Sequence, residues 1–521
     1  MISLRGVRRM AMTVRVTAMG AAATLGLSGC SLAVSSSGGG GGGEHTVGVG
    51  VRAVPAPDSA EAGASRSTAP PVGPPPSVTL PEPEDYRLDN GLRVILVERH
   101  DLPIVSLELL FPGGASAHSA KQAGLAALTA DMLDEGTTTR SALELADQVS
   151  LLGATLSTSA GYDAATVRLG VLRPRLAPAL ALMADVVLRP AFTPEELARV
   201  KRDRTTRILQ SRDRPSVLAA NAFARVLYGP RHPYGMPLIG TAESLESLGR
   251  DDVVRFHGAR YRPDGATLVV AGDVDRPALD SLLARAFAGW SGRIEASAEP
   301  PQPPETGRRT LYLVDRPGSA QSVIRLGRIA TGRATPDYYP LQVLNTILGG
   351  SFTSRLNMKL REEKGYTYGA RSSFDMRRLP GPFVASAAVA TPVTDSSVVE
   401  FLREIDRITR EPVPPDELDQ GRNYLALRLP QRFETVDDLV ARFAELALHG
   451  LPLDSYDGFV DGVERVGADD VLAVARRYLD TDRMAIVIAG DLARIEAPLK
   501  ALSVAPVVVL DRAAGAGGAG R

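Results

Sequence analysis

Arg361 and Tyr368 are the two residues whose types and spacing most suggest chemistry. Apolar residues recur at helical spacing before Gly349 and Gly350 and again after them, so we expect a helix, a glycine break, a short helix and then a strand that begins after Gly365. This order places Arg361 near the end of the short helix and Tyr368 on the strand. A guanidinium and a phenol hydroxyl on the two sides of one tight turn can both donate hydrogen bonds to one carbonyl or oxyanion. On residue types alone, a surface arginine and a half-buried strand tyrosine without such a role remain the commoner explanation.

The segment 1–30 is similar to a bacterial export signal. Basic residues precede an apolar run at 16–27, which is too short to span a bilayer comfortably and ends in Leu-Ser-Gly-Cys30. This ending resembles a lipobox, in which the cysteine becomes the lipidated first residue of the mature protein. Cys30 is the only cysteine, so a disulfide within the chain is excluded. The alternative is a cleaved secretory signal with an incidental cysteine.

Residues 31–81 have the composition of a tether. A serine and glycine run is followed by a segment rich in alanine, proline and serine, and neither can bury enough apolar surface to fold. We therefore expect a disordered tether that holds the folded body away from a membrane. Together with the lipobox, this predicts a lipid-anchored protein of the bacterial cell envelope, and Ser31 after the cysteine favours the periplasmic face of the outer membrane.

The remainder of the chain contains a long internal repeat. The ending Gly272-Asp273 recurs as Gly490-Asp491, and the segment 192–197 recurs in similar form as 413–418, at nearly the same offset. A period this long indicates two duplicated domains rather than a solenoid, whose units are much shorter. We place the domains at 82–298 and 309–510, with a proline-rich linker at 299–308 and a flexible tail at 511–521.

The elements expected in the first domain are grouped without strict alternation of strand and helix. Apolar runs at 93–97 and 104–111 have the pattern of a β-hairpin, with a tight turn at Asn90-Gly91 just before the first run. Helices are expected at 124–133, 142–152 and 251–261, and further strands at 155–159, 165–171 and 266–271. A long helical region is expected from 177 to about 211, with a helix start at Pro194 within it. This grouping predicts an α+β domain with a largely antiparallel sheet, used twice.

The charge balance excludes one class of partner. With 59 basic and 60 acidic side chains in 521 residues, the chain carries almost no net charge. Nothing in this balance indicates nucleic-acid binding.

Residues 344–374 closely resemble the second-domain signature of the pitrilysin/insulinase family of inverted-motif zinc metallopeptidases. In that family Gly-Gly, Ser-Arg-Leu and Leu-Arg-Glu-x-x-Gly-x-x-Tyr occur in this order and spacing. The resemblance, which is to the mitochondrial-processing-peptidase-like bacterial branch, covers roughly 86–491 and includes 231–240. It implies half of a metallopeptidase clamshell, built from two tandem homologous domains. It also implies that Arg361 and Tyr368 help to bind the substrate backbone.

The zinc motif of active members of the family is absent from the corresponding helix. Active members carry His-x-x-Glu-His there, but this chain has Ala127 in place of the first His, Ala130 in place of the Glu and Asp131 in place of the second His. The spacing of the third ligand points to Arg207, whose side chain stays protonated. The six histidines are not spaced as a relocated site would require, since no two are at i, i+3 or i, i+4 spacing. The sequence therefore predicts no metal in this chain and an ion pair between Asp131 and Arg207.

These features favour a non-catalytic subunit of a heteromeric metallopeptidase. A homologous partner with His-x-x-Glu-His would supply zinc, water and the general base, while Arg361 and Tyr368 steady an extended peptide or unfolded polypeptide substrate. Such a chain is expected to be inactive alone and to hold no catalytic residue of its own. A structural scaffold and a peptide-binding envelope lipoprotein that acts alone are the alternatives.

Overall fold

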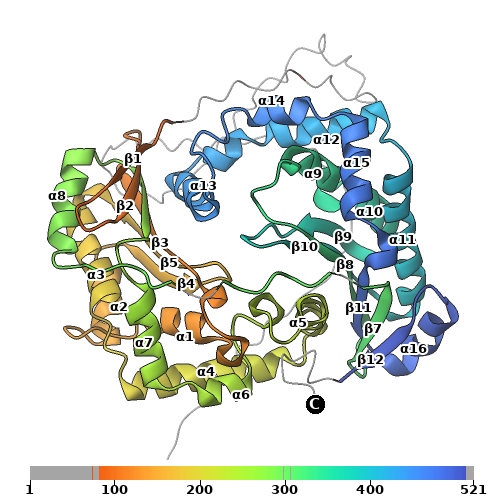
Figure 1. The fold of residues 1–521 in the computed structure, drawn as a ribbon, viewed down its shortest axis with the longest axis horizontal. Helices are drawn as coiled ribbons and strands as arrows, with labels where there is room; N and C mark the ends of the chain where they lie inside the picture. Colours follow the sequence, from red (N-terminus) through yellow and green to blue (C-terminus); the bar gives the residue numbers. More distant parts are fainter. Residues whose placement is uncertain (1–72, 74–80, 297–298, 306, 512–521) are drawn as a thin grey trace, which may run out of the picture. The chain divides into compact units, whose positions relative to one another are not determined.

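The computed structural model describes residues 73, 81–296, 299–305 and 307–511. The predicted signal peptide with Cys30, most of the predicted tether and nearly all of the predicted tail lie outside these residues. Across the described part, two six-stranded sheets follow one another along the chain (Figure 1). The strands of the first lie within 84–272 and those of the second within 310–510, as two tandem α+β domains require. The exact domain limits stay a prediction.

The first sheet has the strand order β1-β2-β6-β3-β5-β4. These strands are β1 (Glu84–Arg87), β2 (Arg93–Glu98), β6 (Thr267–Gly272), β3 (Ile104–Pro112), β5 (Ala164–Leu172) and β4 (Thr155–Ala160). All pairs are antiparallel except β2 with β6. Every residue of the central strand β6 is buried, as its continuous apolar run predicts for a strand that is covered on both faces.

The predicted hairpin between 93–97 and 104–111 is wrong in its pairing. Both runs are strands, but β6 lies between them and forms hydrogen bonds to each. The turn at Asn90-Gly91 instead joins β1 to β2, which do form an antiparallel pair. The sequence between β2 and β3 carries no signal for an inserted strand, because β6 comes from the far end of the first half of the chain.

The second sheet repeats this order as β12-β7-β11-β8-β10-β9. Its strands are β12 (Val507–Leu510), β7 (Thr310–Asp315), β11 (Ala485–Gly490), β8 (Gln321–Thr331), β10 (Gly381–Ala390) and β9 (Thr367–Phe374). Parallel pairs join β7 to β11 and to β12, and the others are antiparallel. The edge strand β9 carries Tyr368, so the candidate substrate-binding residue lies on the last strand of this sheet.

Sixteen α-helices occur in the described residues, eight in each half. Those of the first half are α1 (Leu125–Asp131), α2 (Ala142–Leu151), α3 (Leu176–Leu188), α4 (Pro194–Ser211), α5 (Pro215–Tyr228), α6 (Ala242–Ser247), α7 (Arg250–Arg260) and α8 (Arg276–Ala286). Those of the second half are α9 (Tyr338–Asn345), α10 (Arg355–Asn357), α11 (Thr394–Arg410), α12 (Pro415–Leu427), α13 (Val436–His449), α14 (Phe459–Glu464), α15 (Ala468–Tyr478) and α16 (Leu492–Ala501). Two π-helical segments, Thr346–Gly350 and Met358–Glu363, follow α9 and α10.

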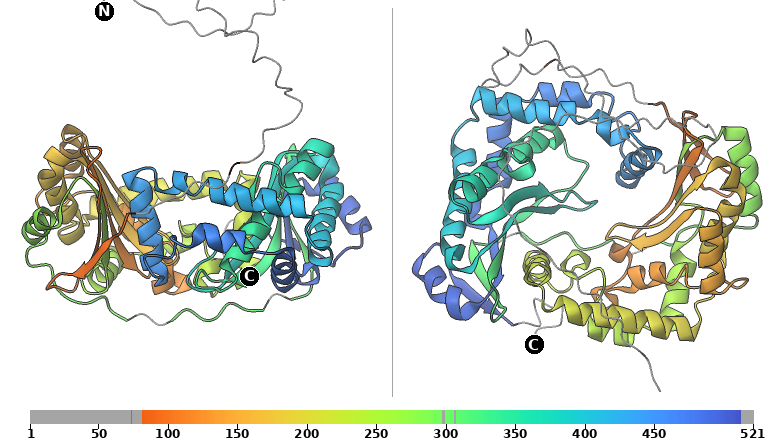
Figure 2. Two further views of the ribbon diagram at one scale, coloured as in Figure 1. Left: turned by 90° about the horizontal axis from the view of Figure 1, so that it is seen from above. Right: turned by 180° about the vertical axis from the view of Figure 1, so that it is seen from behind.

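The two halves exchange one helix each. The apolar face of α5 packs on β8 and β11 of the second sheet, where Leu218 and Phe223 contact a core that includes Val487. In return α13 packs on β3 and β6 of the first sheet. Figure 2 shows α5 on one face of the second sheet and α11 on the other. Because each sheet is completed by a helix from the other half, the two halves share their cores.

Every described helix is too short or too polar to span a bilayer.

Candidate functional site

The helix that aligns with the zinc motif is α1, a short and almost fully buried helix. Gly124 precedes it with a φ of +91°, and a Cβ at this position would lie 2.9 Å from the Cα of Gly240. This close approach packs the end of the 231–240 segment against the start of α1, so that segment positions the helix. Ala127 and Ala130 are buried on α1 at the positions that correspond to the first His and the Glu of His-x-x-Glu-His. Asp131, at the position of the second His, ends the helix.

Asp131 forms an ion pair with two arginines of α4. Its Oδ2 lies 2.8 Å from Arg204 Nη2 and 3.8 Å from Arg207 Nη2. The predicted pairing with Arg207 is therefore present, but it is the longer of the two, and the Arg207 side chain is 56% exposed. Arg204 is 4% exposed, donates from Nε to the same Asp131 oxygen over 2.8 Å, and donates from Nη1 to the carbonyl of Ile239. Arg204 thus joins α4, α1 and the 231–240 segment.

The residues at this position do not fit a zinc ion. Two methyl groups have no lone pair to offer, and the remaining carboxylate is taken up by a buried guanidinium. Burial lowers the pKa of Arg204 and the charge of Asp131 opposes this shift, and an arginine stays protonated in either case. Nor do any three His, Cys, Asp or Glu side chains in the described part of the chain group in a way that could hold a metal.

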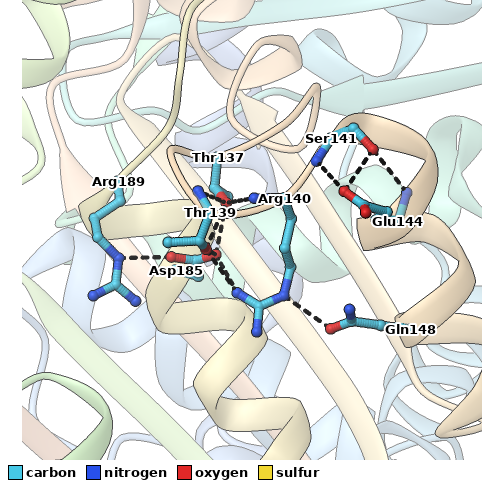
Figure 3. A network of polar contacts seen from close by, with 8 residues as sticks. All are labelled: Thr137, Thr139, Arg140, Ser141, Glu144, Gln148, Asp185 and Arg189. Atoms are coloured by element: carbon cyan, nitrogen blue, oxygen red, sulfur yellow. Dashed lines mark hydrogen bonds and ion pairs between the residues drawn. The ribbon is translucent and has the colours of Figure 1, made fainter.

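The loop that follows α1 is held by a buried carboxylate. Asp185 of α3 is fully buried and accepts hydrogen bonds from Thr137, Thr139, Arg140 and Arg189 at 2.6 to 2.8 Å (Figure 3). Burial acts to raise the pKa of Asp185, but these hydrogen bonds outweigh it and lower the pKa below its usual value. The loop leads into α2, whose first turn is closed by a capping box. Side-chain hydrogen bonds within the protein therefore hold the loop that follows α1.

The predicted order of helix, glycine break, short helix and strand at 344–374 is confirmed. The helix α9 runs into the π-helical segment that ends in Gly349 and Gly350, and β9 begins at Thr367 after Gly365. A Cβ on Gly349 would lie 2.3 Å from the backbone nitrogen of Ser372. The first glycine is therefore needed where the π-helical segment crosses β9, and this crossing fixes the position of the edge strand.

Arg361 lies in the second π-helical segment and is partly exposed. Its guanidinium carbon lies 4.6 Å from the centre of the Phe352 ring, and its Nε lies 3.3 Å from the carboxylate of Glu362. The Phe352 ring is itself well exposed. An aromatic face attracts the guanidinium while leaving its N–H groups able to donate. Phe352 therefore orients Arg361 at the surface, and the sequence reasoning did not identify it.

Tyr368 is 91% exposed because β9 is irregular at this point. The pairing of β9 with β10 shifts register between Ala387 and Val389, so a bulge covers Tyr368 and Gly369. The Thr367 hydroxyl holds the bulge by donating to the Ala388 carbonyl over 2.7 Å and accepting from the Gly369 N–H over 3.1 Å. A bulge re-aims a side chain relative to a regular strand. Tyr368 thus points to solvent, although Ala370 on the same strand is buried. No hydrogen bond joins Tyr368 to Arg361 among the described residues.

Sequence reasoning also missed Arg204, although a signal for it exists. The buried residues of α4 are Leu197, Val200, Arg204 and Ile208, which recur at helical spacing. An arginine within such an apolar stripe faces the core, whereas Arg207 lies one turn away toward solvent.

Comparison with known proteins agrees with this architecture. A sequence model described as "Insulinase (Peptidase family M16)" matches residues 93–228, and one described as "Peptidase M16 inactive domain" matches residues 247–425. An uncharacterized zinc protease of Mycobacterium tuberculosis is 28% identical over 404 residues, which cover 76% of this chain and 91% of that protein.

Solved structures match the same part of the chain. A peptidase M16 inactive domain from Pseudomonas fluorescens is similar with a TM-score of 0.74 and 27% identity, over 78% of this chain and 98% of that one. A protease from Helicobacter pylori matches with a TM-score of 0.72 at 19% identity, over 79% of this chain and 100% of that one, and supports the fold alone.

The fold and site together define a class of protein: a pair of tandem α+β domains of the M16 type, with an ion pair where the zinc motif would stand. The chain belongs to the insulinase, or M16, family of peptidases.

Proposed function

We propose that this chain is the zinc-lacking, non-catalytic subunit of a heteromeric M16 metallopeptidase. The observation that carries the proposal is the contrast between two places in the chain. The former zinc position is closed by the Asp131–Arg204 ion pair, while Tyr368 is exposed on the edge strand β9 and Arg361 is partly exposed in the π-helical segment before it. In this proposal a homologous partner carrying His-x-x-Glu-His supplies the zinc and the general base.

The role of this subunit is to hold an extended peptide. As an edge strand, β9 can offer an added strand those backbone groups that have no partner in the chain, and the Ala370 N–H is not among them because it donates to the Asn357 side chain. Arg361 and Tyr368 then donate hydrogen bonds to a substrate carbonyl, and these bonds strengthen as negative charge develops on its oxygen. The Phe352 ring and the bulge held by Thr367 position the two donors. An anchor at Cys30 on the envelope membrane remains part of this proposal.

Substitution in the assembled complex tests these roles. Arg361→Ala and Tyr368→Phe should each lower kcat on the order of 10²-fold, the typical effect of removing one donor to a developing oxyanion. Size-exclusion chromatography should show that the complex still forms. Arg371→Ala removes an exposed cation from the same strand and should leave kcat unchanged.

Unchanged kcat in both variants would contradict the proposed role of the two donors. If the complex forms and cleaves equally well with either variant, the structural-scaffold alternative explains the chain better. If the wild-type chain binds peptide but never associates with a partner that carries His-x-x-Glu-His, a peptide-binding protein that acts alone explains the chain better.

A further inference from the structure

A cavity of about 810 Å³ lies in the second half, over the pair of helices α9 and α12. Its walls come from α9 and the π-helical segment after it, the loop that follows β9, the end of α12, and α13. Asn345 and Tyr424 lie on two of these walls, and Arg428 and Arg432 lie just past the end of α12. The cavity reaches Phe374 at the end of β9, and Tyr368 near the start of that strand does not line it.

The internal repeat gives this cavity a counterpart in the first half. The helices α4 and α12 begin at Pro194 and Pro415, and Arg428 follows the start of α12 at the same interval as Arg207 follows the start of α4. The separation of Ala127 from Asn345 along the chain equals that of Gly272 from Gly490, the ends of the two repeats. Asn345 is therefore the counterpart of Ala127 in the second half. The cavity therefore occupies, in the second half, the place where the first half is closed by the Asp131–Arg204 ion pair.

The three carboxylates of the cavity are all engaged within the protein. Each accepts hydrogen bonds from neighbouring groups: Glu445 from Arg333 and Arg442 at 3.0 and 2.8 Å, Asp375 from Arg377 at 3.0 Å, and Asp438 from the backbone and hydroxyl of Thr435 at 3.1 and 2.6 Å. Glu445 and Asp375 are thus paired with arginines, whereas Asp438 caps the first turn of α13 and forms no ion pair within the described residues.

Two guanidinium groups at the cavity have aromatic neighbours instead of carboxylates. Arg428 donates to the Tyr424 hydroxyl and lies 4.9 Å from the centre of that ring. Arg432 lies 5.5 Å from the centre of the Phe459 ring. Within the described residues neither arginine forms an ion pair. Aromatic contacts hold a guanidinium in place without cancelling its charge, so both cations remain available to an anion.

We propose that this cavity binds a carboxylate of the peptide substrate through Arg428 and Arg432. Both arginines line this cavity, and a guanidinium suits a carboxylate, which can accept two parallel N–H bonds from it. The carboxylate is either the C-terminus of the peptide or an Asp or Glu side chain within it. The inference rests on the proposed function, in which the chain binds an extended peptide. It adds that the chain prefers peptides that carry a carboxylate.

Fluorescence anisotropy with four labelled peptides tests the inference on the full-length chain. The peptides share one short neutral sequence and differ only in their acidic groups, with a free or an amidated C-terminus and with or without one internal Glu. Peptides that bear a carboxylate of the right kind should bind at least about tenfold tighter than the neutral amide, as one charge-assisted contact allows. The peptide that gains affinity identifies the C-terminus or the side chain as the source.

Substitution then locates the contact. Arg428→Gln and Arg432→Gln should each remove most of the tenfold preference while leaving the affinity for the neutral amide unchanged. Arg410→Gln, an exposed arginine on α11 outside this cavity, is the matched control and should keep the preference. Equal affinity of the wild-type chain for all four peptides would overturn the inference and leave the proposed function standing. If the wild-type chain binds none of the four, the proposed peptide-binding function fails as well.

Discussion

Arg204 Nε and Nη2 both lie 2.8 Å from Asp131 Oδ2, and this contact closes the place where active members of the family hold zinc. The arginine is buried on the apolar face of α4, so its charge depends on the carboxylate for compensation. Arg207, one turn farther along, reaches the same oxygen only at 3.8 Å and from an exposed position. The two arginines should therefore differ sharply in their contribution to stability.

Asp131→Ala should lower the free energy of unfolding by about 3 kcal/mol, because it leaves a buried guanidinium without a counter-charge. Arg207→Ala should cost under about 1 kcal/mol, as expected for an exposed pair. Urea unfolding followed by circular dichroism measures both. The double variant Asp131→Ala/Arg204→Met should recover most of the loss, since it removes the stranded charge. Similar losses in the two single variants would contradict the assignment of Arg204 as the main partner.

Asp134 should make stability depend on pH. Burial, helped by the nearby charges of Glu135 and Asp131, raises the pKa of its carboxyl from 3.8 to about 6. The folded chain thus holds this proton more tightly than the unfolded chain does. The carboxyl therefore favours folding most below pH 3.8, and this contribution is lost as pH rises to about 6.

Asp134→Asn should accordingly be more stable than wild type at about pH 7.5, by roughly 1 to 3 kcal/mol, and no more stable at about pH 4. Chemical unfolding at a series of pH values measures the difference. A stability difference that stays constant across this range would show that the pKa of Asp134 is not raised.

Phe223→Ala tests the exchange of helices between the halves. This residue belongs to the first half of the sequence but is buried against the second sheet, so its truncation should cost about 3 to 5 kcal/mol. Hydrogen exchange followed by mass spectrometry should show that, relative to wild type, this variant exchanges its amide hydrogens faster in β8 and β11. The increase should be smaller in the strands of the first sheet. Faster exchange confined to the first sheet would contradict the observed packing of α5.

The sequence was sufficient to predict the duplicated α+β domains and the absence of the zinc motif. Hydrophobic periodicity is visible within each short segment, and the repeat offset and the motif positions follow from counting residues. It did not predict that β6 separates β2 from β3, since a pairing with a distant strand leaves no trace in the turn between neighbours. The choice of Arg207 over Arg204 followed from residue counting, which ignores which face of α4 is buried. The exposure of Tyr368 depends on a bulge at Gly369 that strand alternation does not indicate.

The central claim is that this chain contributes to proteolysis without a metal of its own. The most direct measurement is the rate of peptide cleavage by a purified His-x-x-Glu-His partner as this chain is added, with the zinc content of each protein determined beforehand. We expect no cleavage and no stoichiometric zinc for this chain alone, and a cleavage rate that rises and saturates as the partner is bound. Cleavage by this chain alone with bound zinc, or a partner whose rate is indifferent to this chain, would contradict it.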